Sequence, residues 1–306
     1  MADLRPHPGT EVDLARVMAA RRALVEAALE HWLPVQGDRP PTVHEAMRYS
    51  VFAGGKRLRP LLVLLACEAV GGDPADGMPA AVGLEMIHTY SLIHDDLPAM
   101  DDDDFRRGRP TCHKVYGEAI AILAGDGLLT QAFRVLADPG AGQVPPSRRL
   151  QIIAEIAEAA GSLGMVGGQA MDILSEGRAL DRETMLYLHT HKTGALIRAS
   201  IRAGGISGGA DGESLAALTR YGEAVGLAFQ IVDDILDIEG ATEEMGKSAG
   251  SDARKHKATY PALFGLEVSR RDAARLLAEG KAALRPLGEK ASMLIALADC
   301  VGNRRH

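Results

Sequence analysis

Two clusters of aspartates stand out in the sequence as groups that could bind metal ions. The first starts with Asp95-Asp96 and continues, after four residues, with the run 101–104. The second is the segment 233–237, which reads Asp-Asp-Ile-Leu-Asp within the apolar stretch 225–238. Carboxylates so close together repel one another unless a cation is present. Because no His or Cys cluster accompanies them, these hard oxygen ligands favour Mg²⁺ or Ca²⁺ over zinc, and neither segment has the spacing of a calcium loop.

The two clusters differ in how well a simple solvated loop would explain them. A run of charge such as 101–104 is usually exposed, and taken alone it favours that interpretation. In the second cluster, helical spacing places Asp233 and Asp237 on one face with Asp234 beside them. Acidic groups on an otherwise apolar helix tend to be paired or to hold a metal. Mg²⁺ is typically shared between a few carboxylates and the phosphates of a substrate.

Basic residues recur in short motifs that suit the binding of diphosphate groups. The segment 54–60, Gly-Gly-Lys-Arg-Leu-Arg-Pro, is expected to place Lys56 and Arg59 one helical turn apart behind a flexible Gly pair. Further basic groups are Arg106-Arg107, His191-Lys192, Lys247 and Lys257. Each is weak evidence alone. Together with the aspartates they suit two diphosphates, one held through bridging Mg²⁺ and one by direct Arg and Lys contacts.

Helices must position these groups, because helical periodicity extends over nearly the whole chain. Helices are expected at 12–33, 60–70, 80–94, 118–136, 148–160, 182–206, 215–238 and 272–284. Pro98 should end or kink the helix before the first cluster. No stretch alternates like a half-buried strand, and no linker marks a domain boundary. The prediction is a single all-α domain over residues 1–306, a large bundle of roughly ten helices that builds its site between facing helices.

Composition narrows the class of protein. Aromatic residues make up 4% of the chain, which argues against a sheet-rich core. The net charge of −7, without a basic stripe, argues against nucleic-acid binding. The longest apolar run, Leu61 to Cys67, is far short of the ~20 residues that span a bilayer, and no secretory signal is recognised. Cys67, Cys112 and Cys300 are widely spaced, which indicates reduced thiols in a cytoplasmic protein. The run Leu61–Leu65 predicts a helix buried on all sides or at a subunit contact.

The ordered set of motifs resembles the trans-isoprenyl diphosphate synthases over roughly Val43 to the C-terminus. The matching segments are GGKRLRP, SLIHDDLPAMDDDDFRRGRPTCH, GGQAMDI, HKTG, FQIVDDILD and GKSAGSDARKHKATYPAL. Within the family, the chain looks most like bacterial farnesyl diphosphate synthases. The resemblance implies an isoprenoid-synthase bundle around a central active-site cavity. It also implies condensation of isopentenyl diphosphate with dimethylallyl and geranyl diphosphates to farnesyl diphosphate.

The resemblance also assigns roles to individual residues. Metal ligands, for three Mg²⁺ ions in the closed state, would be Asp95, Asp96, Asp101, Asp233, Asp234 and Asp237. The allylic diphosphate would contact Arg106, Lys192, Lys247 and Lys257. Isopentenyl diphosphate would be held by Lys56, Arg59, His88 and Arg107. The developing cation would face Thr193, Gln230 and the carbonyl of Lys192, which with Asp95 and Asp233 form the expected catalytic set.

The implied mechanism agrees with the chemistry of these groups. Charge on the departing pyrophosphate would be stabilised by Mg²⁺ and cationic side chains, leaving an allylic cation that the second alkene attacks. The proton would leave to pyrophosphate, in a cavity that excludes water. Product length in the family depends on an apolar tunnel beneath the first aspartates. Tyr90 and Ser91, one helical turn below Asp95, are therefore expected to set it, with Tyr90 as the floor; a merely packed aromatic is the simpler alternative.

Several alternatives remain open at this point. One is a geranylgeranyl or geranyl diphosphate synthase with the same site and a different tunnel. A terpene cyclase generally lacks the second aspartate motif and the site of Lys56 and Arg59. A non-catalytic partner subunit would typically have degraded aspartate motifs, and a simple cation-binding helical protein would not need the basic set. The family implies a homodimer. The tail Arg304-Arg305-His306 could approach the isopentenyl site, although an unstructured terminus is the favoured interpretation.

Overall fold

Helices make up nearly all of the part of the chain that the computed structural model describes, residues 10–35, 37–177, 180–243 and 259–304. The longer helices are α1 (Thr10–Trp32), α2 (Pro41–Val51), α3 (Leu58–Ala69), α4 (Pro74–Asp95), α6 (Glu118–Ala137), α7 (Pro146–Ala160), α8 (Met165–Leu174), α10 (Ala195–Ser207), α11 (Gly212–Glu243), α14 (Leu266–Ala283) and α15 (Ser292–Gly302). The shorter elements are the hairpin β1 (Phe105–Arg106) and β2 (Arg109–Pro110), the helices α5 (Cys112–Tyr116), α9 (Arg182–Leu188) and α13 (Tyr260–Phe264), the π-helix η1 (His189–Gly194) and the 3₁₀-helix η2 (Arg285–Ala291).

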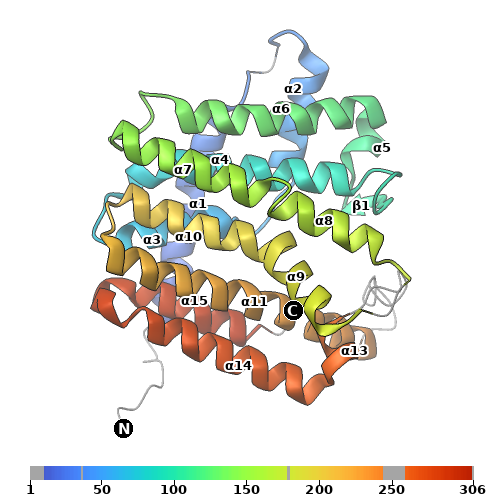
Figure 1. The fold of residues 1–306 in the computed structure, drawn as a ribbon. Helices are drawn as coiled ribbons and strands as arrows, with labels where there is room; N and C mark the ends of the chain where they lie inside the picture. Colours follow the sequence, from blue (N-terminus) through green and yellow to red (C-terminus); the bar gives the residue numbers. More distant parts are fainter. Residues whose placement is uncertain (1–9, 36, 178–179, 244–258, 305–306) are drawn as a thin grey trace.

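The helices lie in successive rows, with α6, α7 and α8, α10, α11 and α14 following one another across the molecule (Figure 1). The expected all-α fold is therefore confirmed. Three longer helices, α2, α8 and α15, were not predicted, and α4 begins earlier than expected. At α4, Pro74 occupies the first turn and the Asp73 side chain accepts a hydrogen bond from the Ala75 N–H at 2.9 Å. A Pro read as a helix breaker can thus start a helix, because a first-turn residue needs no N–H.

Helix α3 is buried inside this chain. Leu61 to Leu65 are each at most 2% exposed, and α3 packs against α4 and α10. Of the two interpretations of this apolar run, burial on all sides is the one that the structure supports. A helix that is apolar around its whole circumference is stable only where other helices cover every face.

The predicted continuous helix 182–206 is wrong in one respect. The segment is helical throughout, but its middle, η1, is a π-helix between α9 and α10. A π-turn carries one extra residue per turn and shifts the direction of the side chains that follow, and such turns are frequent at functional sites. The turn includes Lys192 and Thr193, two of the predicted site residues.

Two expectations from composition can be compared with the structure. By length and composition alone, the helical stretches Glu118–Ala137 and Pro146–Leu174 would be long and apolar enough to cross a membrane. This is weak evidence, because core helices of soluble proteins pass the same test. The cysteines are free thiols, as expected, with Cys67 and Cys112 buried and Cys300 exposed.

Candidate active site

The first aspartate cluster is shaped by a turn that closes directly after α4. The helix ends at Asp95, as expected for a segment followed by Pro98. The N–H of Asp101 then donates to the carbonyl of Asp95 at 2.8 Å, and the N–H of Asp103 donates to the carbonyl of Asp96 at 3.2 Å. The four residues between Asp96 and Asp101 thus form a turn that returns Asp101 to the end of the helix.

The carboxylates of this cluster differ in how their charge is compensated. Burial raises the pKa of Asp95 to about 6, against an attraction from Lys192 and with added repulsion from Asp101. Asp96 is buried and accepts from Arg106 Nε at 2.8 Å and Nη2 at 2.7 Å. Partly desolvated, mutually repelling carboxylates with only oxygen donors fit a hard cation that keeps some of its water. The residues present therefore fit Mg²⁺.

The second cluster lies on α11, and two of its members contact distant parts of the chain. Asp234 accepts from the N–H of Tyr260 at 2.7 Å, and its Oδ2 lies 3.4 Å from Nε2 of His189. Burial raises the pKa of Asp233, against attractions from Arg304 and Lys56. Asp237 follows Asp233 by one turn of α11. The carboxylate of Asp234 thus helps to hold α13 against α11, in addition to its place in the cluster.

The contact of Arg304 corrects the expectation of an unstructured C-terminal tail. Its Nη1 lies 2.6 Å from Oδ1 of Asp233, and its guanidinium stacks 4.9 Å from the ring centroid of Phe229. The prediction is therefore wrong for Arg304, because an ion pair and a cation–π contact hold it. Residues 305 and 306 lie outside the described residues.

The π-helix brings two predicted residues to new partners. Nζ of Lys192 lies 2.5 Å from Oδ2 of Asp172 on α8, and the hydroxyl of Thr193 donates to Oε1 of Gln230 at 2.8 Å. Asp172 is a residue that the sequence analysis missed. The available signal was its position in GGQAMDI, one helical turn after Gln169. Gly168 in the same motif has no side chain, and a Cβ there would overlap the backbone of Lys192.

A cavity of about 360 Å³ collects many of the predicted residues. Those that line it are Arg59, His88, Tyr90, Ser91, Asp95, Lys192 and Thr193. Tyr90 is 7% exposed and packs edge-to-face on His94, with ring centroids 5.7 Å apart. The rest of the wall is mostly apolar, with Met165, Val166 and Ile173 among its residues. The cavity therefore joins charged groups at Asp95 to an apolar wall that includes Tyr90.

The basic residues beside this cavity are buried to different degrees. Burial lowers the pKa of Arg59 to about 10, and burial together with the charges of Arg59 and Arg107 keeps the pKa of His88 well below its ordinary value. His88 is therefore a neutral imidazole at neutral pH. Arg107 donates to the carbonyl of Gly54, and a Cβ at Gly55 would overlap the Arg107 side chain. The Gly pair thus makes room for an arginine from the loop that follows the first aspartate cluster.

The expected helical spacing of Lys56 and Arg59 is wrong, because α3 begins only at Leu58. Lys56 lies in the preceding loop, and Arg57 at the helix boundary has the left-handed φ of 52°. The buried Arg57 side chain donates to Oε1 of Glu85 and to the carbonyl of Val51, each at 2.7 Å. The three basic residues of this motif therefore have different surroundings. Lys56 lies in the loop, Arg57 holds α3 to α4, and Arg59 lines the cavity.

Two of the residues predicted for the site, Lys247 and Lys257, lie outside the described residues. A cavity of about 760 Å³ lies between η1, α10, α11 and α14, with Arg198, Arg220 and Leu227 in its wall. It contains no member of either aspartate cluster, so its size does not make it the candidate active site.

Comparisons with known proteins agree with this arrangement. The family described as polyprenyl synthetase matches residues 40–286. The chain is 47% identical to a farnesyl diphosphate synthase of Geobacillus stearothermophilus, over 97% of this chain and 99% of that one. It is 49% identical to a chloroplastic geranylgeranyl pyrophosphate synthase of Capsicum annuum, over 92% of this chain and 76% of that one. The crystal structure of an FPP/GFPP synthase from Zymomonas mobilis superimposes with a TM-score of 0.86 at 37% identity, covering 95% and 99% of the two chains.

Proposed function

Because the chain belongs to the polyprenyl synthetase family, whose members are prenyltransferases, we propose that it makes farnesyl diphosphate. The substrates would be isopentenyl diphosphate with dimethylallyl and then geranyl diphosphate. The observation that carries the proposal is the cavity in which Tyr90 lies one helical turn below Asp95. Names alone do not decide between products, since relatives of similar identity are described as farnesyl and as geranylgeranyl synthases.

The two aspartate clusters would hold Mg²⁺, through Asp95, Asp96 and Asp101 on one side and through Asp233, Asp234 and Asp237 on the other. When bound, Mg²⁺ supplies positive charge that stabilises a departing diphosphate. Arg106 and Lys192 would contact the same allylic diphosphate, and Lys247 and Lys257 are proposed with them from the resemblance. Asp172 would fix the position of Lys192 for this role, because it forms a 2.5 Å ion pair with Lys192, which lines the same cavity as Asp95.

Isopentenyl diphosphate would be bound by Lys56, Arg59, His88 and Arg107. The neutral state of His88 suits a hydrogen-bond donor among arginines, where a further positive charge would be costly. The hydroxyl of Thr193, bound to Gln230, and the carbonyl of Lys192 would face the allylic cation with their oxygen dipoles. The proton released on condensation would go to the departed pyrophosphate, so no side chain needs to act as a base.

Chain length would be set by Tyr90, with Ser91 next to it in the same wall. The buried Tyr90 ring is fixed by its contact with His94, and His94 in turn lies against Gly125 of α6 and within 3.1 Å of the Ile122 carbonyl. A growing apolar chain would meet a packed aromatic pair at this depth. A rigid wall is costly to move, because interiors are densely packed.

The test is a product assay with Mg²⁺, isopentenyl diphosphate and each of the dimethylallyl, geranyl and farnesyl diphosphates as starter. Growth should stop at fifteen carbons, and Tyr90→Ala should extend it to twenty or more. Tyr49→Ala serves as the control, since its ring packs on Tyr116, its hydroxyl donates to the Pro110 carbonyl, and it is not in the cavity wall. Twenty-carbon products from the unaltered protein would overturn the farnesyl proposal. An unchanged product from Tyr90→Ala would show that Tyr90 does not limit chain length. No elongation from any starter would favour a partner-subunit role.

We also propose that the protein is a homodimer, as the resemblance implies. The exposed apolar side chains Ile122 and Leu123 on α6 support a partner at this helix. A cytoplasmic location stays a prediction, since similar relatives include a protein described as chloroplastic.

A further inference from the structure

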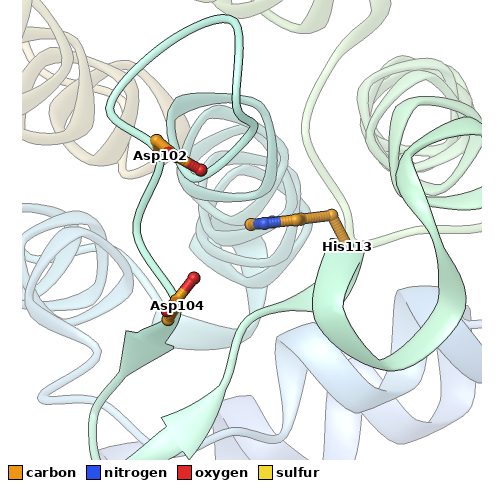
Figure 2. Close-up of side chains that lie close together, drawn as sticks. All are labelled: Asp102, Asp104 and His113. Atoms are coloured by element: carbon orange, nitrogen blue, oxygen red, sulfur yellow. The ribbon is translucent and has the colours of Figure 1, made fainter.

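A second group of potential metal ligands lies on the loop that follows the first aspartate cluster. Asp102, Asp104 and His113 each offer one ligand atom, and these atoms lie within 4.8 Å of one another. Figure 2 shows the two carboxylates and the imidazole directed toward a common point, the aspartates from the loop and His113 from α5. None of the three belongs to the proposed catalytic set. The acidic loop alone would carry no argument, since exposed carboxylates are common.

The buried imidazole of His113 supplies the independent observation. Its side chain is 6% exposed, and within the described chain its Nε2 has no hydrogen-bond partner. Its Nδ1 lies 3.1 Å from the hydroxyl of Thr111. That hydroxyl donates its only hydrogen to the carbonyl of Asp103 at 2.8 Å, so it must accept from Nδ1–H. The tautomer is thereby set, and the lone pair of Nε2 is left available.

The backbone holds the two aspartates near this imidazole. The N–H of Thr111 donates to the carbonyl of Asp104 at 3.0 Å, which ties the loop to the start of α5. Asp102 has a left-handed φ of 50°, a conformation that costs energy outside glycine. Asp104 lies with Oδ1 2.6 Å from Nζ of Lys114 on α5, a contact that also holds the loop against this helix. Two carboxyl groups and a buried imidazole therefore share one small space.

We propose that Asp102, Asp104 and His113 form a second, peripheral metal site, which takes one divalent ion of the zinc type. One imidazole nitrogen with two carboxylates is a borderline donor set that zinc accepts in tetrahedral geometry, whereas Mg²⁺ prefers oxygen alone. Zinc bonds to nitrogen and oxygen are about 2.0–2.2 Å, so the three donors must close by roughly 1 Å on binding. The loop can supply this movement because Asp102 and Asp104 are exposed. Water would complete the coordination.

The bound ion would act as a positioning group and not in catalysis. It would join the loop to α5 at a point between Asp101 and the hairpin that carries Arg106. A cross-link there would limit the motion of Asp101 and Arg106, and the proposed function uses both of these side chains.

The experiment is a Zn²⁺ titration of the chelator-treated full-length protein by calorimetry, in millimolar Mg²⁺ so that the all-oxygen clusters are occupied. We expect one equivalent of Zn²⁺ at micromolar affinity or tighter. Asp102→Asn and His113→Gln should each weaken it at least tenfold, whereas the controls Asp38→Asn and His31→Gln should not. Asp102→Asn tests an exposed residue, so its result does not depend on whether the buried His113→Gln variant folds. Thr111→Val should weaken binding about tenfold, because it removes the hydroxyl that fixes the Nδ1–H tautomer of His113.

Absence of Zn²⁺ binding would overturn the proposed peripheral site. Equal Zn²⁺ affinity in the unaltered protein and Asp102→Asn would overturn it as well. Loss of Zn²⁺ binding in Asp95→Asn, with binding kept in Asp102→Asn, would assign the ion to the catalytic cluster and also overturn it. Co²⁺ in place of Zn²⁺ gives a second readout, because its visible spectrum should change between the unaltered protein and His113→Gln. None of these readouts depends on prenyl transfer, so the site and the proposed function can fail separately.

Discussion

Among single residues, the aspartates proposed to bind Mg²⁺ differ in how the fold compensates their charge. Asp95 is the clearest case, since burial and the repulsion of neighbouring carboxylates outweigh the attraction of Lys192 and raise its pKa to about 6. In its charged form such a residue lowers the stability of the folded protein, and a bound cation restores that stability. Asp96, in contrast, has its charge compensated by Arg106.

Asp95→Asn should therefore stabilise the metal-free protein at neutral pH. The folded-state pKa lies above the ordinary value, so stability is lost as pH rises from about 4 to about 6, and the cost is complete above 6. Replacing the carboxyl should raise the free energy of unfolding at pH 7.5 by about 3 kcal/mol, and change it little at pH 4. Urea denaturation at the two pH values, with and without Mg²⁺, measures this. An equal gain at pH 4 would contradict the electrostatic cause.

Mg²⁺ affinity should follow the same ionisation. Binding requires the carboxylate, so protonation of Asp95 below pH about 6 competes with the ion. The apparent Mg²⁺ affinity of the protein should fall steadily from pH 7 to pH 5, as calorimetry can measure. A pH-independent affinity across this range would show that Asp95 does not contribute to binding.

Among the elements, the contact between α8 and η1 fixes the position of Lys192, a proposed substrate-binding residue. Gly168→Ala should disturb it, because the added methyl group would overlap the backbone of Lys192. We expect a loss of about 1–3 kcal/mol in the free energy of unfolding and a fall in kcat from displacement of Lys192. Gly212→Ala is the matched control, since a Cβ there meets nothing within 4 Å. Unchanged kcat in Gly168→Ala would argue against a position-sensitive role for this contact.

At the scale of the whole molecule, the C-terminal end of the chain reaches the second aspartate cluster. Arg304 pairs with Asp233, a proposed Mg²⁺ ligand, so its guanidinium and the ion would compete for one carboxylate. Arg304→Gln should tighten Mg²⁺ binding of the substrate-free protein several-fold, with Arg285→Gln as the control. Weaker Mg²⁺ binding in Arg304→Gln would show that Arg304 supports the metal site and does not compete with it.

The proposed dimer is tested at the same scale. Leu123 on α6 is 51% exposed, and a charge placed in a buried interface there would be strongly unfavourable. Leu123→Glu should shift the protein from dimer to monomer in light scattering. Leu263→Glu on α13, where the leucine is 39% exposed, should leave the dimer intact. A dimer in both variants would exclude α6 as the contact.

The helical class and most helix positions follow from local patterns in the sequence, as do the residue types of the proposed site. Those properties depend on local spacing: apolar periodicity sets a helix, and Asp233 and Asp237 share a face because of the helical repeat. The end of α4 shortly before Pro98 is likewise a local effect, because proline disfavours helix in the residue before it.

Which distant side chains meet depends on how the helices pack and cannot be found from local patterns. Asp233 and Arg304 are 71 positions apart, and Lys192 and Asp172 are 20 apart, so no local pattern relates them. The packing of α8 on η1 and of α15 beside α11 creates these pairs, and the loop beside α5 joins His113 to two aspartates. Burial then sets the ionisation of the groups, because desolvation depends on everything packed around a side chain and not on its neighbours in sequence.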